Sequence, residues 1–398
     1  MPLVHHELEQ AQLIVFSDDW GRHPSSCQHL ISKLLPRYRT TWVNTIGTRR
    51  PGFSAGDIRK VLAKLRQWSM PADRRDLPAN LTVLNPRMWP GFRSGIQRRM
   101  NANLISRAVH DALGPRSRDR SPRIAITTLP ITADLVGKLE VDRWIYYCVD
   151  DFSVWPGLDG EVMRRMELEQ VQKVDDLIAV SQVLCDRIAQ MGRQATLLTH
   201  GIDLEHWSAP AGSPPDGAEL PNWWPRDGHP VYLFWGLIDP RLEVGWCRAA
   251  AVRLPGTLVL VGPQQLGDEG LVLPGRAIVP GPVPYQQLPK LAAAADVLVM
   301  PYADLPVSRA MQPLKFKEYL ATGKPVVSRR LPATEPWADA ADLVDNLETF
   351  LDLIQERTRT GVPPMQVEAR RRLRAETWAD KAAAFEKKLW THVHAAMK

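Results

Sequence analysis

Short apolar runs of about four to six residues alternate with segments of helical periodicity along the whole chain. In the first half the runs occupy residues 13–16, 40–44, 81–84, 123–128, 144–149, 176–180 and 195–199. In the second half they occupy residues 231–236, 257–262, 277–281, 296–301 and 325–328. Runs without polar alternation indicate parallel strands that are buried on both faces. The pattern therefore predicts an α/β fold of doubly wound, Rossmann-like parallel sheets, in which ligands bind at the carboxyl ends of the strands.

The periodic pattern breaks between residues 206 and 230, where HWSAPAGSPPDGAELPNWWPRDGHP is rich in proline and glycine. We interpret this stretch as a linker between an N-terminal domain of residues 1–205 and a second domain of residues 231–375. The last segment, residues 376–398, has the pattern of a terminal helix and is expected to pack back on the N-terminal domain. Two domains of similar size joined in this way are expected to face a cleft.

The stretch MQPLKFKEYLATGKPVV, residues 311–327, places a lysine where helix physics disfavours one. Pro313 suits the first helical position, and Gly323 suits a left-handed exit from the helix. Lys315 would then lie in the first turn, beside the positive end of the helix dipole. A bound phosphate or diphosphate would resolve that conflict. The alternative is that the lysine extends into solvent.

Glu318 follows on the same predicted helix and shares a stripe with the apolar residues Leu314 and Ala321. A carboxylate at this position could accept two hydrogen bonds from a ribose diol. The alternative is an ion pair with Lys315 at the i to i+3 spacing. Helix geometry by itself does not separate the two interpretations.

The segment PLKFKEYLATGKPVVS resembles the signature of retaining GT-B glycosyltransferases, especially glycosyltransferase family 4. Four other segments resemble the family in the same order: LLTHGIDLEHW (197–207), FWGLIDPRLE (234–243), LVLVGP (258–263) and VPGPVPYQQLPKLAAAADVLVMP (279–301). The resemblance covers roughly residues 195–330 and reaches the first half only in architecture. It implies the GT-B architecture and transfer of a sugar, with retention, from a UDP- or GDP-sugar, with no bound metal and no other cofactor.

The resemblance also assigns donor-side residues. Glu318 matches the glutamate that holds the donor ribose, whereas the family's first glutamate is replaced by Ala310. Val283 matches the position that pairs with the nucleobase through its backbone. The loop whose backbone amides meet sugar and phosphate corresponds to Met311, Gln312, Pro313 and Leu314.

The phosphate loop departs from the family pattern. Leu237 follows Gly236 where the family usually has Gly-Arg, and Arg241 is the nearest cation. The resemblance therefore implies that Arg241 and Lys315 share the donor diphosphate, and that both act in catalysis. A planar guanidinium suits that task because it binds phosphate in a bidentate manner.

Two strand ends in the first half carry paired aspartates, in LIVFSDDW (13–20) and YYCVDDF (146–152). Adjacent side chains of a strand point to opposite faces, so these pairs are not expected to hold a metal ion. Asp150 stands where the family often has a histidine that faces the transferred sugar, and we assign it a catalytic role. Asp19 and Asp151 either bind the acceptor or cap the following helices. His23 either contacts the acceptor or is an ordinary turn residue.

Composition narrows the setting of this chemistry. Hydrophobic residues make up 44% of the chain and charged residues 24%, with no run long enough to span a membrane. The start, MPLVHHELEQ, lacks an apolar signal-peptide core. The four cysteines form no CxxC pair, which favours a reducing compartment, so a cytoplasmic location is expected.

The net charge of +6 is unevenly distributed, because residues 49–123 contain 17 Lys and Arg against 5 Asp and Glu. Within this region DIRKVLAKLRQWSM (57–70) has the pattern of a basic amphipathic helix. Such a helix suits peripheral binding to the inner, anionic face of a membrane, where an acceptor is lipid-linked. The alternative is a helix that packs on the domain core with its cations in solvent.

The function predicted from these features is transfer of a sugar to a glycan or lipid-linked acceptor in exopolysaccharide or cell-surface glycan synthesis. A nucleotide-sugar epimerase of the same fold is one alternative, and it would form product without any acceptor. A basic nucleic-acid-binding protein is the other. The basic region shows no stacking aromatic pattern or nucleic-acid motif, so no nucleic acid partner is expected.

Overall fold

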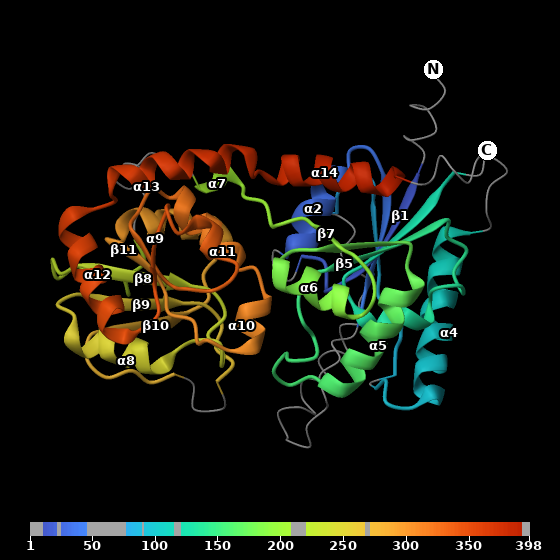
Figure 1. Cartoon of the computed structure of the whole chain (residues 1–398), viewed down its shortest axis with the longest axis horizontal. Helices are drawn as coiled ribbons and strands as arrows, with labels where there is room; N and C mark the ends of the chain where they lie inside the picture. Colours follow the sequence, from blue (N-terminus) through green and yellow to red (C-terminus); the bar gives the residue numbers. More distant parts are fainter. Residues whose placement is uncertain are drawn as a thin grey trace. The chain divides into compact units, whose positions relative to one another are not determined.

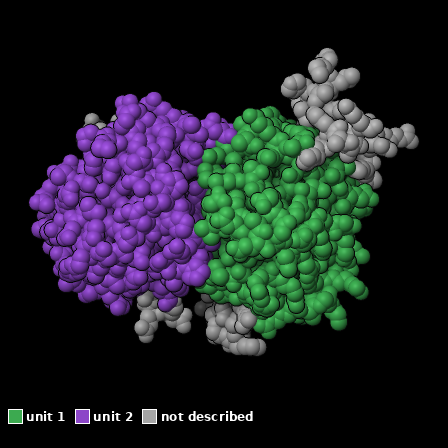
Figure 2. Space-filling model, viewed as in Figure 1, with its two compact units in different colours: residues 1–199, 381–398 green, residues 200–380 purple. Residues whose placement is uncertain are grey.

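The computed structural model describes residues 11–21, 25–45, 77–89, 91–114, 121–207, 220–266 and 271–391. They form two compact units: unit 1 comprises residues 1–199 and 381–398, and unit 2 comprises residues 200–380 (Figure 2). Both His23 and the predicted helix 57–70 lie outside the described residues. No helix in the described part of the chain is both long enough and apolar enough to cross a membrane.

Unit 1 is built on a parallel seven-stranded sheet with the order β3-β2-β1-β4-β5-β6-β7. Its strands are β1 (Gln12–Ser17), β2 (Arg39–Asn44), β3 (Leu81–Leu84), β4 (Arg123–Thr127), β5 (Arg143–Cys148), β6 (Asp176–Ala179) and β7 (Thr196–Leu197). Its helices are α2 (Ser26–Leu34), α4 (Gly95–Leu113), the 3-10 helix η2 (Pro130–Asp134), α5 (Gly160–Lys173) and α6 (Gln182–Gln190). Every side chain of β4 and β5 is buried, as expected for central parallel strands.

Unit 2 is built on a parallel six-stranded sheet with the order β10-β9-β8-β11-β12-β13 and has helices on both faces (Figure 1). Its strands are β8 (Val231–Trp235), β9 (Thr257–Val261), β10 (Ala277–Gly281), β11 (Val297–Met300), β12 (Val326–Arg329) and β13 (Asp342–Val344). Its α-helices are α7 (Leu204–Trp207), α8 (Val244–Arg253), α9 (Leu288–Ala294), α10 (Pro306–Ala310), α11 (Leu314–Ala321), α12 (Leu347–Thr360) and α13 (Pro364–Ala369). Its 3-10 helices are η3 (Tyr285–Gln287), η4 (Glu335–Trp337) and η5 (Arg370–Ala375), and α14 (Trp378–Trp390) begins in this unit.

The fold class predicted from the sequence is confirmed, because both sheets are parallel and doubly wound. Each apolar run of the sequence forms a strand. One further strand, β13, was not predicted from the sequence. It has three residues at the edge of its sheet, and two of them are only partly buried. So short an edge strand carries too few apolar positions for a recognisable period.

The strand orders identify where ligands are expected. The chain direction across each sheet reverses between β1 and β4 in unit 1 and between β8 and β11 in unit 2. At such a switch point the loops leaving two neighbouring strands diverge to opposite faces and leave a crevice beyond the carboxyl ends. The residues that follow β8 and β11 are therefore the first candidates for a site in unit 2.

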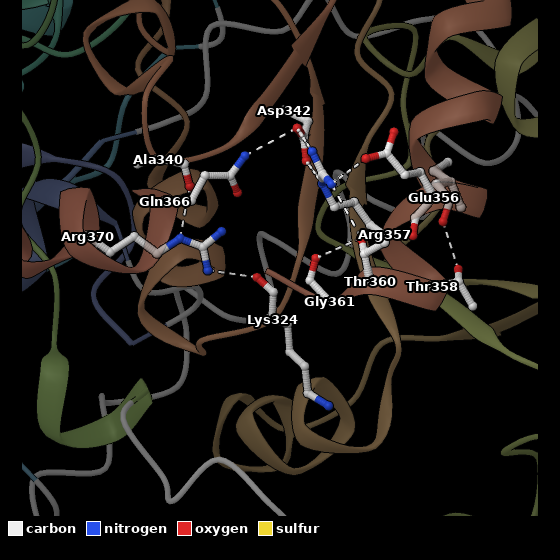
Figure 3. A network of polar contacts seen from close by, with 11 residues as sticks. Lys324, Ala340, Asp342, Glu356, Arg357, Thr358, Thr360, Gly361, Gln366 and Arg370 are labelled. Carbon is white, nitrogen blue, oxygen red and sulfur yellow. Dashed lines mark hydrogen bonds and ion pairs between the residues drawn. The ribbon is translucent and has the colours of Figure 1, made fainter. Parts of the chain in front are cut away.

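A buried polar network holds the C-terminal part of unit 2 together (Figure 3). Asp342 on β13 accepts two hydrogen bonds from Arg357 on α12, at 2.7 and 2.8 Å, and a third from Gln366 on α13 at 3.2 Å. Arg370 donates to the carbonyl oxygens of Ala340 and Lys324 at 2.9 and 2.8 Å, and burial lowers its pKa to about 10. The network thus fixes the turn that follows α11.

Residues 381–390 of α14 belong to unit 1. The ring of Phe385 meets Tyr147 on β5 edge to face, with 5.7 Å between centroids. Glu386 accepts a hydrogen bond from the Tyr38 hydroxyl at 2.5 Å and pairs with Arg37 at 2.6 Å. The end of the helix is therefore part of the packing of unit 1.

Candidate functional site

Helix α11 begins one residue later than the sequence analysis predicted. Pro313 is the N-cap, with φ −67° and an extended ψ of 115°, so Lys315 is the second helical residue instead of the third. Proline fixes φ but leaves ψ free, so the sequence could not determine on which side of the boundary Pro313 lies. Gly323 has φ +75° and provides the expected left-handed exit. Lys315 still lies in the first turn, beside the positive end of the helix dipole.

The ammonium group of Lys315 lies at the switch point of unit 2. Its Nζ donates a hydrogen bond to the Tyr302 hydroxyl at 2.6 Å and lies over the Phe234 ring, 4.4 Å from the centroid. A Cβ added to Gly236 would come within 1.9 Å of Nζ. The lysine head therefore occupies a notch that exists only because residue 236 is glycine. Since Gly236 follows β8 and Tyr302 follows β11, the lysine contacts both strand ends and does not extend into solvent.

Lys315 and Arg241 differ in how their charges are balanced. Arg241 donates from Nε to both Asp239 carboxylate oxygens at 3.0 Å and pairs through Nη2 at 2.8 Å. Its backbone N–H also donates to Asp239, which makes a tight local turn. In the described part of the chain no carboxylate forms an ion pair with Lys315. Lys315 is therefore the cation of this site whose charge is available to an anion.

Glu318 lies one turn further along α11 among aromatic donors. Its Oε2 accepts a hydrogen bond from Trp235 Nε1 at 3.1 Å, and its Oε1 accepts one from the Tyr285 hydroxyl at 3.4 Å. Burial raises the pKa of Glu318 to about 7, an effect that Trp235 and the nearby Lys315 charge offset only in part. Within the described residues the direct Glu318–Lys315 ion pair considered above is not formed.

Trp235 and Tyr285 belong to an aromatic cluster beside this carboxylate, which we define as His206, Trp207, Trp235 and Tyr285. Trp207 stacks on Trp235 with centroids 5.1 Å apart and planes 5° apart, and its Nε1 donates to the Tyr285 hydroxyl at 3.1 Å. His206 stacks on Tyr285 with centroids 4.4 Å apart and also meets Trp207 edge to face at 5.0 Å. None of these four residues was predicted from the sequence. The available signal was Trp235 as the last residue of a strand, at the end where ligands bind.

The remaining predicted donor-side residues line the same end of unit 2. Met311 accepts a weak hydrogen bond at its sulfur from Arg241 Nη1 at 3.5 Å. The Gln312 side chain accepts from the backbone N–H of His200 at 2.5 Å, which fixes the segment before α11. Val283, after β10, packs against the core of the unit. Pro313 and Leu314 form the N-terminus of α11.

At the switch point of unit 1 lies an aspartate that was not predicted as a site residue. Asp18 follows β1 and accepts hydrogen bonds from the hydroxyls of Ser17 at 2.9 Å and Ser25 at 3.1 Å. The surrounding chain partly desolvates the Asp18 carboxyl and so raises its pKa, although the residue is exposed at the surface. Ser25 also caps α2, where its side chain accepts from the backbone N–H of Gln28 at 3.3 Å. The carbonyl oxygen of Asp19, the residue that was predicted, accepts from the Gln28 side chain.

The second aspartate pair follows β5. Asp151 is buried, accepts from the backbone N–H and hydroxyl of Ser153 at 2.9 and 2.5 Å, and pairs with Arg187 at 3.1 Å. Arg187 also pairs with the buried Glu167 at 2.6 Å. Asp151 therefore fixes the turn that carries its neighbour Asp150, which is only partly buried.

Comparison with known proteins connects this geometry to a family. Residues 230–355 match the model of the family described as "Glycosyl transferases group 1". We call this matched segment, which is about a third of the chain, the group 1 domain. The group 1 domain runs from the start of β8 into α12 and contains all of the predicted donor-side residues.

One protein with a similar sequence is also described as a glycosyltransferase. TuaH of Bacillus subtilis, which is assigned to teichuronic acid biosynthesis as a glycosyltransferase, is 34% identical over 184 residues. The match covers 44% of this chain and 45% of TuaH, so the chain spans less than half the length of this relative.

Solved structures of low sequence identity share the fold. A sucrose-phosphate synthase from Thermosynechococcus elongatus superposes with a TM-score of 0.69 at 15% identity, over 97% of this chain and 100% of that chain. Anabaena HepE in complex with UDP-glucose superposes with a TM-score of 0.58 at 14% identity, over 97% of each chain. The α,α-trehalose 6-phosphate synthase of Burkholderia multivorans gives 0.59 at 15% identity, over 97% of this chain and 100% of that chain. The predicted GT-B fold is confirmed.

Proposed function

We propose that this chain is a retaining glycosyltransferase that moves a sugar from a UDP- or GDP-sugar to a hydroxyl group of a glycan or lipid-linked acceptor. The observation that carries the proposal is the Lys315 ammonium, which lies at a helix N-terminus and at the switch point of a group 1 domain. The similarity to TuaH, whose name places it in teichuronic acid biosynthesis, supports a role in cell-surface polysaccharide synthesis. The UDP-glucose complex of HepE supports a nucleotide-sugar donor.

In this proposal each donor-side residue has a distinct task. Glu318 accepts hydrogen bonds from the ribose diol, and Val283 pairs with the nucleobase through its backbone. Lys315 and the amides at the start of α11 hold the diphosphate, next to Gly236 and the segment 311–314. Arg241, held by Asp239, supports the same anion from the neighbouring loop. Because Ala310 supplies no carboxylate, the sugar hydroxyls are left to the backbone of this segment.

The reaction follows from where charge develops. The bond between the anomeric carbon and the diphosphate oxygen breaks through an oxocarbenium-like transition state, and negative charge accumulates on the leaving diphosphate. Lys315 and the helix amides stabilise that charge. The acceptor hydroxyl attacks from the same face, forms the new carbon–oxygen bond and gives its proton to the leaving phosphate. Attack on the same face retains the configuration at the anomeric carbon.

The residues of unit 1 are proposed to serve the acceptor. Asp150 is assigned to the sugar being transferred, and Asp19 and His23 to the acceptor. Asp151 then acts through the turn that carries Asp150, because its carboxylate is occupied by Ser153 and Arg187.

Lys315→Gln tests the diphosphate site. Its affinity for UDP or GDP should fall about 10- to 100-fold, because a charged hydrogen bond is worth about 1.5–3 kcal/mol. Its affinity for uridine or guanosine should change less than about twofold. Calorimetric titration of each nucleotide and its nucleoside measures both, and Lys290→Gln on α9 is the control. Equal losses for nucleotide and nucleoside would contradict the assignment.

The proposal includes independence from divalent metal, since the cations of the protein replace a metal at the diphosphate. Sugar transfer should therefore continue at an unchanged rate in EDTA. Loss of activity in EDTA, with recovery on adding Mn²⁺, would contradict it.

A further inference from the structure

Helix α4 of unit 1 presents apolar side chains on two opposite faces. The inner face packs on the unit through Ala102, Ile105 and Val109, which are 1–3% exposed. The outer face carries Ile96, Met100 and Leu104, whose exposed fractions are 82%, 38% and 38%. The outer residues follow one another at intervals of four, so they form a continuous stripe along the helix. A surface helix normally has one apolar face, and the second one on α4 requires a separate explanation.

The outer stripe is bordered by cations. Arg99 and Arg107 are exposed and border this stripe, because Arg99 lies three residues after Ile96 and Arg107 lies three residues after Leu104. The single acidic residue of α4 is Asp111, in its last turn. We call Ile96, Arg99, Met100, Asn103, Leu104 and Arg107 the α4 outer face.

A basic hollow of about 650 Å³ adjoins the α4 outer face and shares Arg99 with it. Its cationic lining residues come from α4, α5 and the segments next to them: Arg93, Arg98, Arg99, Lys138, Arg165 and Lys173. Its two acidic residues, Asp134 and Glu169, both pair with Arg98, at 2.8 Å in the case of Asp134. Arg93 pairs with Asp159 and Lys173 also pairs with Glu169, so the positive charge of the hollow rests mainly on Arg99, Lys138 and Arg165.

We propose that the α4 outer face and the basic hollow dock unit 1 on an anionic lipid bilayer. An anionic bilayer is complementary to this surface in both charge and polarity. A bilayer surface offers apolar chains beneath a layer of phosphates, so the stripe would insert while Arg99, Arg107 and the hollow contact lipid phosphates. A soluble polyanion would engage the cations but gain nothing from Ile96, Met100 and Leu104. This surface goes beyond the proposed sugar transfer and does not depend on it.

Flotation of the full chain with liposomes tests the proposal. The protein should bind vesicles that contain 30% phosphatidylglycerol in phosphatidylcholine, and binding should fall steeply between 0.1 and 0.5 M NaCl. Pure phosphatidylcholine vesicles should not bind it. Arg99→Gln with Arg107→Gln should weaken binding about 30-fold, because each cation near an anionic surface contributes about fivefold. Ile96→Ser, Met100→Ser and Leu104→Ser together should weaken it at least about tenfold.

The matched control carries equivalent exposed substitutions in unit 2. Met365 and Val367 are 83% and 53% exposed, and Arg359 is also exposed. Met365→Ser, Val367→Ser and Arg359→Gln together should leave vesicle binding unchanged. Unfolding midpoints of all variants should match the wild type, because every substituted side chain is exposed. Calorimetric titration of UDP and GDP reports on the donor site separately, and the α4 variants should leave it unaffected.

Three results would overturn the proposal. The first is wild-type protein that ignores phosphatidylglycerol vesicles at 0.1 M NaCl. The second is vesicle binding that the α4 substitutions do not change, which would assign the contact to another part of the chain. The third is a wild-type dimer that the serine substitutions convert to a monomer in size-exclusion chromatography, with vesicle binding unaffected. In that case a second copy covers the stripe.

Discussion

Glu318 illustrates how surroundings determine the chemistry of a single residue. Burial among Trp235, Tyr285 and their neighbours raises its pKa to about 7, whereas in the unfolded chain the carboxyl titrates near 4.5. Between these two values the folded protein holds a proton that the unfolded chain has lost. Stability must therefore fall as pH rises from about 4.5 to about 7, and it stays lower above that window.

Glu318→Gln should remove this pH dependence. At pH 8 the variant should be more stable than the wild type by roughly 1–3 kcal/mol, a range reduced because Glu318 is partly exposed. At pH 4.5 the two proteins should unfold at nearly the same denaturant concentration. Urea unfolding at both pH values measures the difference. The variant should also bind UDP and GDP more weakly at pH 8, and a variant that binds both as tightly as the wild type would remove the ribose assignment.

Glu368→Gln is the matched control for this experiment. Glu368 is exposed on α13 of the same unit, where it pairs with Arg371. Its substitution should leave both the pH dependence of stability and the binding of nucleotides unchanged.

Gly236→Ala tests the notch that holds the lysine head. The added Cβ would displace Lys315 Nζ, which is the end of a flexible side chain, so the fold should survive. Affinity for UDP or GDP should fall at least about tenfold, as expected when a charged hydrogen bond is lost. Gly228→Ala is the control, since Gly228 also has a positive φ, +76°, but its added Cβ meets nothing within 4 Å. It should cost about 1 kcal/mol of stability and no affinity.

At the scale of elements, α11 is held at both ends. At its start Gln312 accepts from the backbone N–H of His200, and the buried Lys317 pairs with Glu376 at 2.6 Å. At its end the carbonyl oxygen of Lys324 accepts from Arg370. These contacts link α11 to residues before β8 and after α13, so the helix that carries Lys315 and Glu318 is positioned by distant parts of unit 2.

Arg357→Met tests the polar network around Asp342, which lies next to the turn after α11. It leaves the nearly buried Asp342 carboxylate without its bidentate partner, and we expect a loss of about 2–3 kcal/mol in the free energy of unfolding. Arg253→Met is the control, because Arg253 forms an exposed pair with Glu348. That pair is solvated, so its loss should leave stability nearly unchanged. Equal unfolding midpoints for the two variants in guanidinium chloride would show that the network adds nothing to stability.

At the scale of the whole molecule, the donor-side residues and the aromatic cluster all fall within unit 2. That unit has its own continuous core, which includes β8, β9, β11 and β12 and the helices packed on them. Charge is also divided unevenly along the chain. Residues 49–123, which include α4, carry a net charge of +12, whereas the rest of the chain carries −6.

A fragment of residues 200–380 should therefore fold and bind UDP or GDP with an affinity within about threefold of the full chain. It should not transfer sugar, because it lacks Asp150 and the rest of unit 1. Circular dichroism, thermal unfolding and calorimetric titration of the fragment test this expectation. A folded fragment that binds neither nucleotide would show that the donor site needs residues of unit 1.

The sequence alone determined the class of fold and the ends of the strands where chemistry is placed. Continuous apolar runs have a period and length that only buried parallel strands satisfy, and this identified every strand except the short edge strand β13. The first-turn position of Lys315 and the exit at Gly323 follow from local backbone physics.

Only the tertiary structure decided what surrounds these residues. Lys315 meets Phe234, Gly236 and Tyr302, and Glu318 meets Trp235 and Tyr285, all from other strands and loops. The tertiary structure also showed that Asp239 balances Arg241 and that Asp18 lies at the switch point of unit 1. Such contacts depend on strand order and on the direction of each side chain. A local pattern encodes the period of an element but not the neighbours that the fold brings to it.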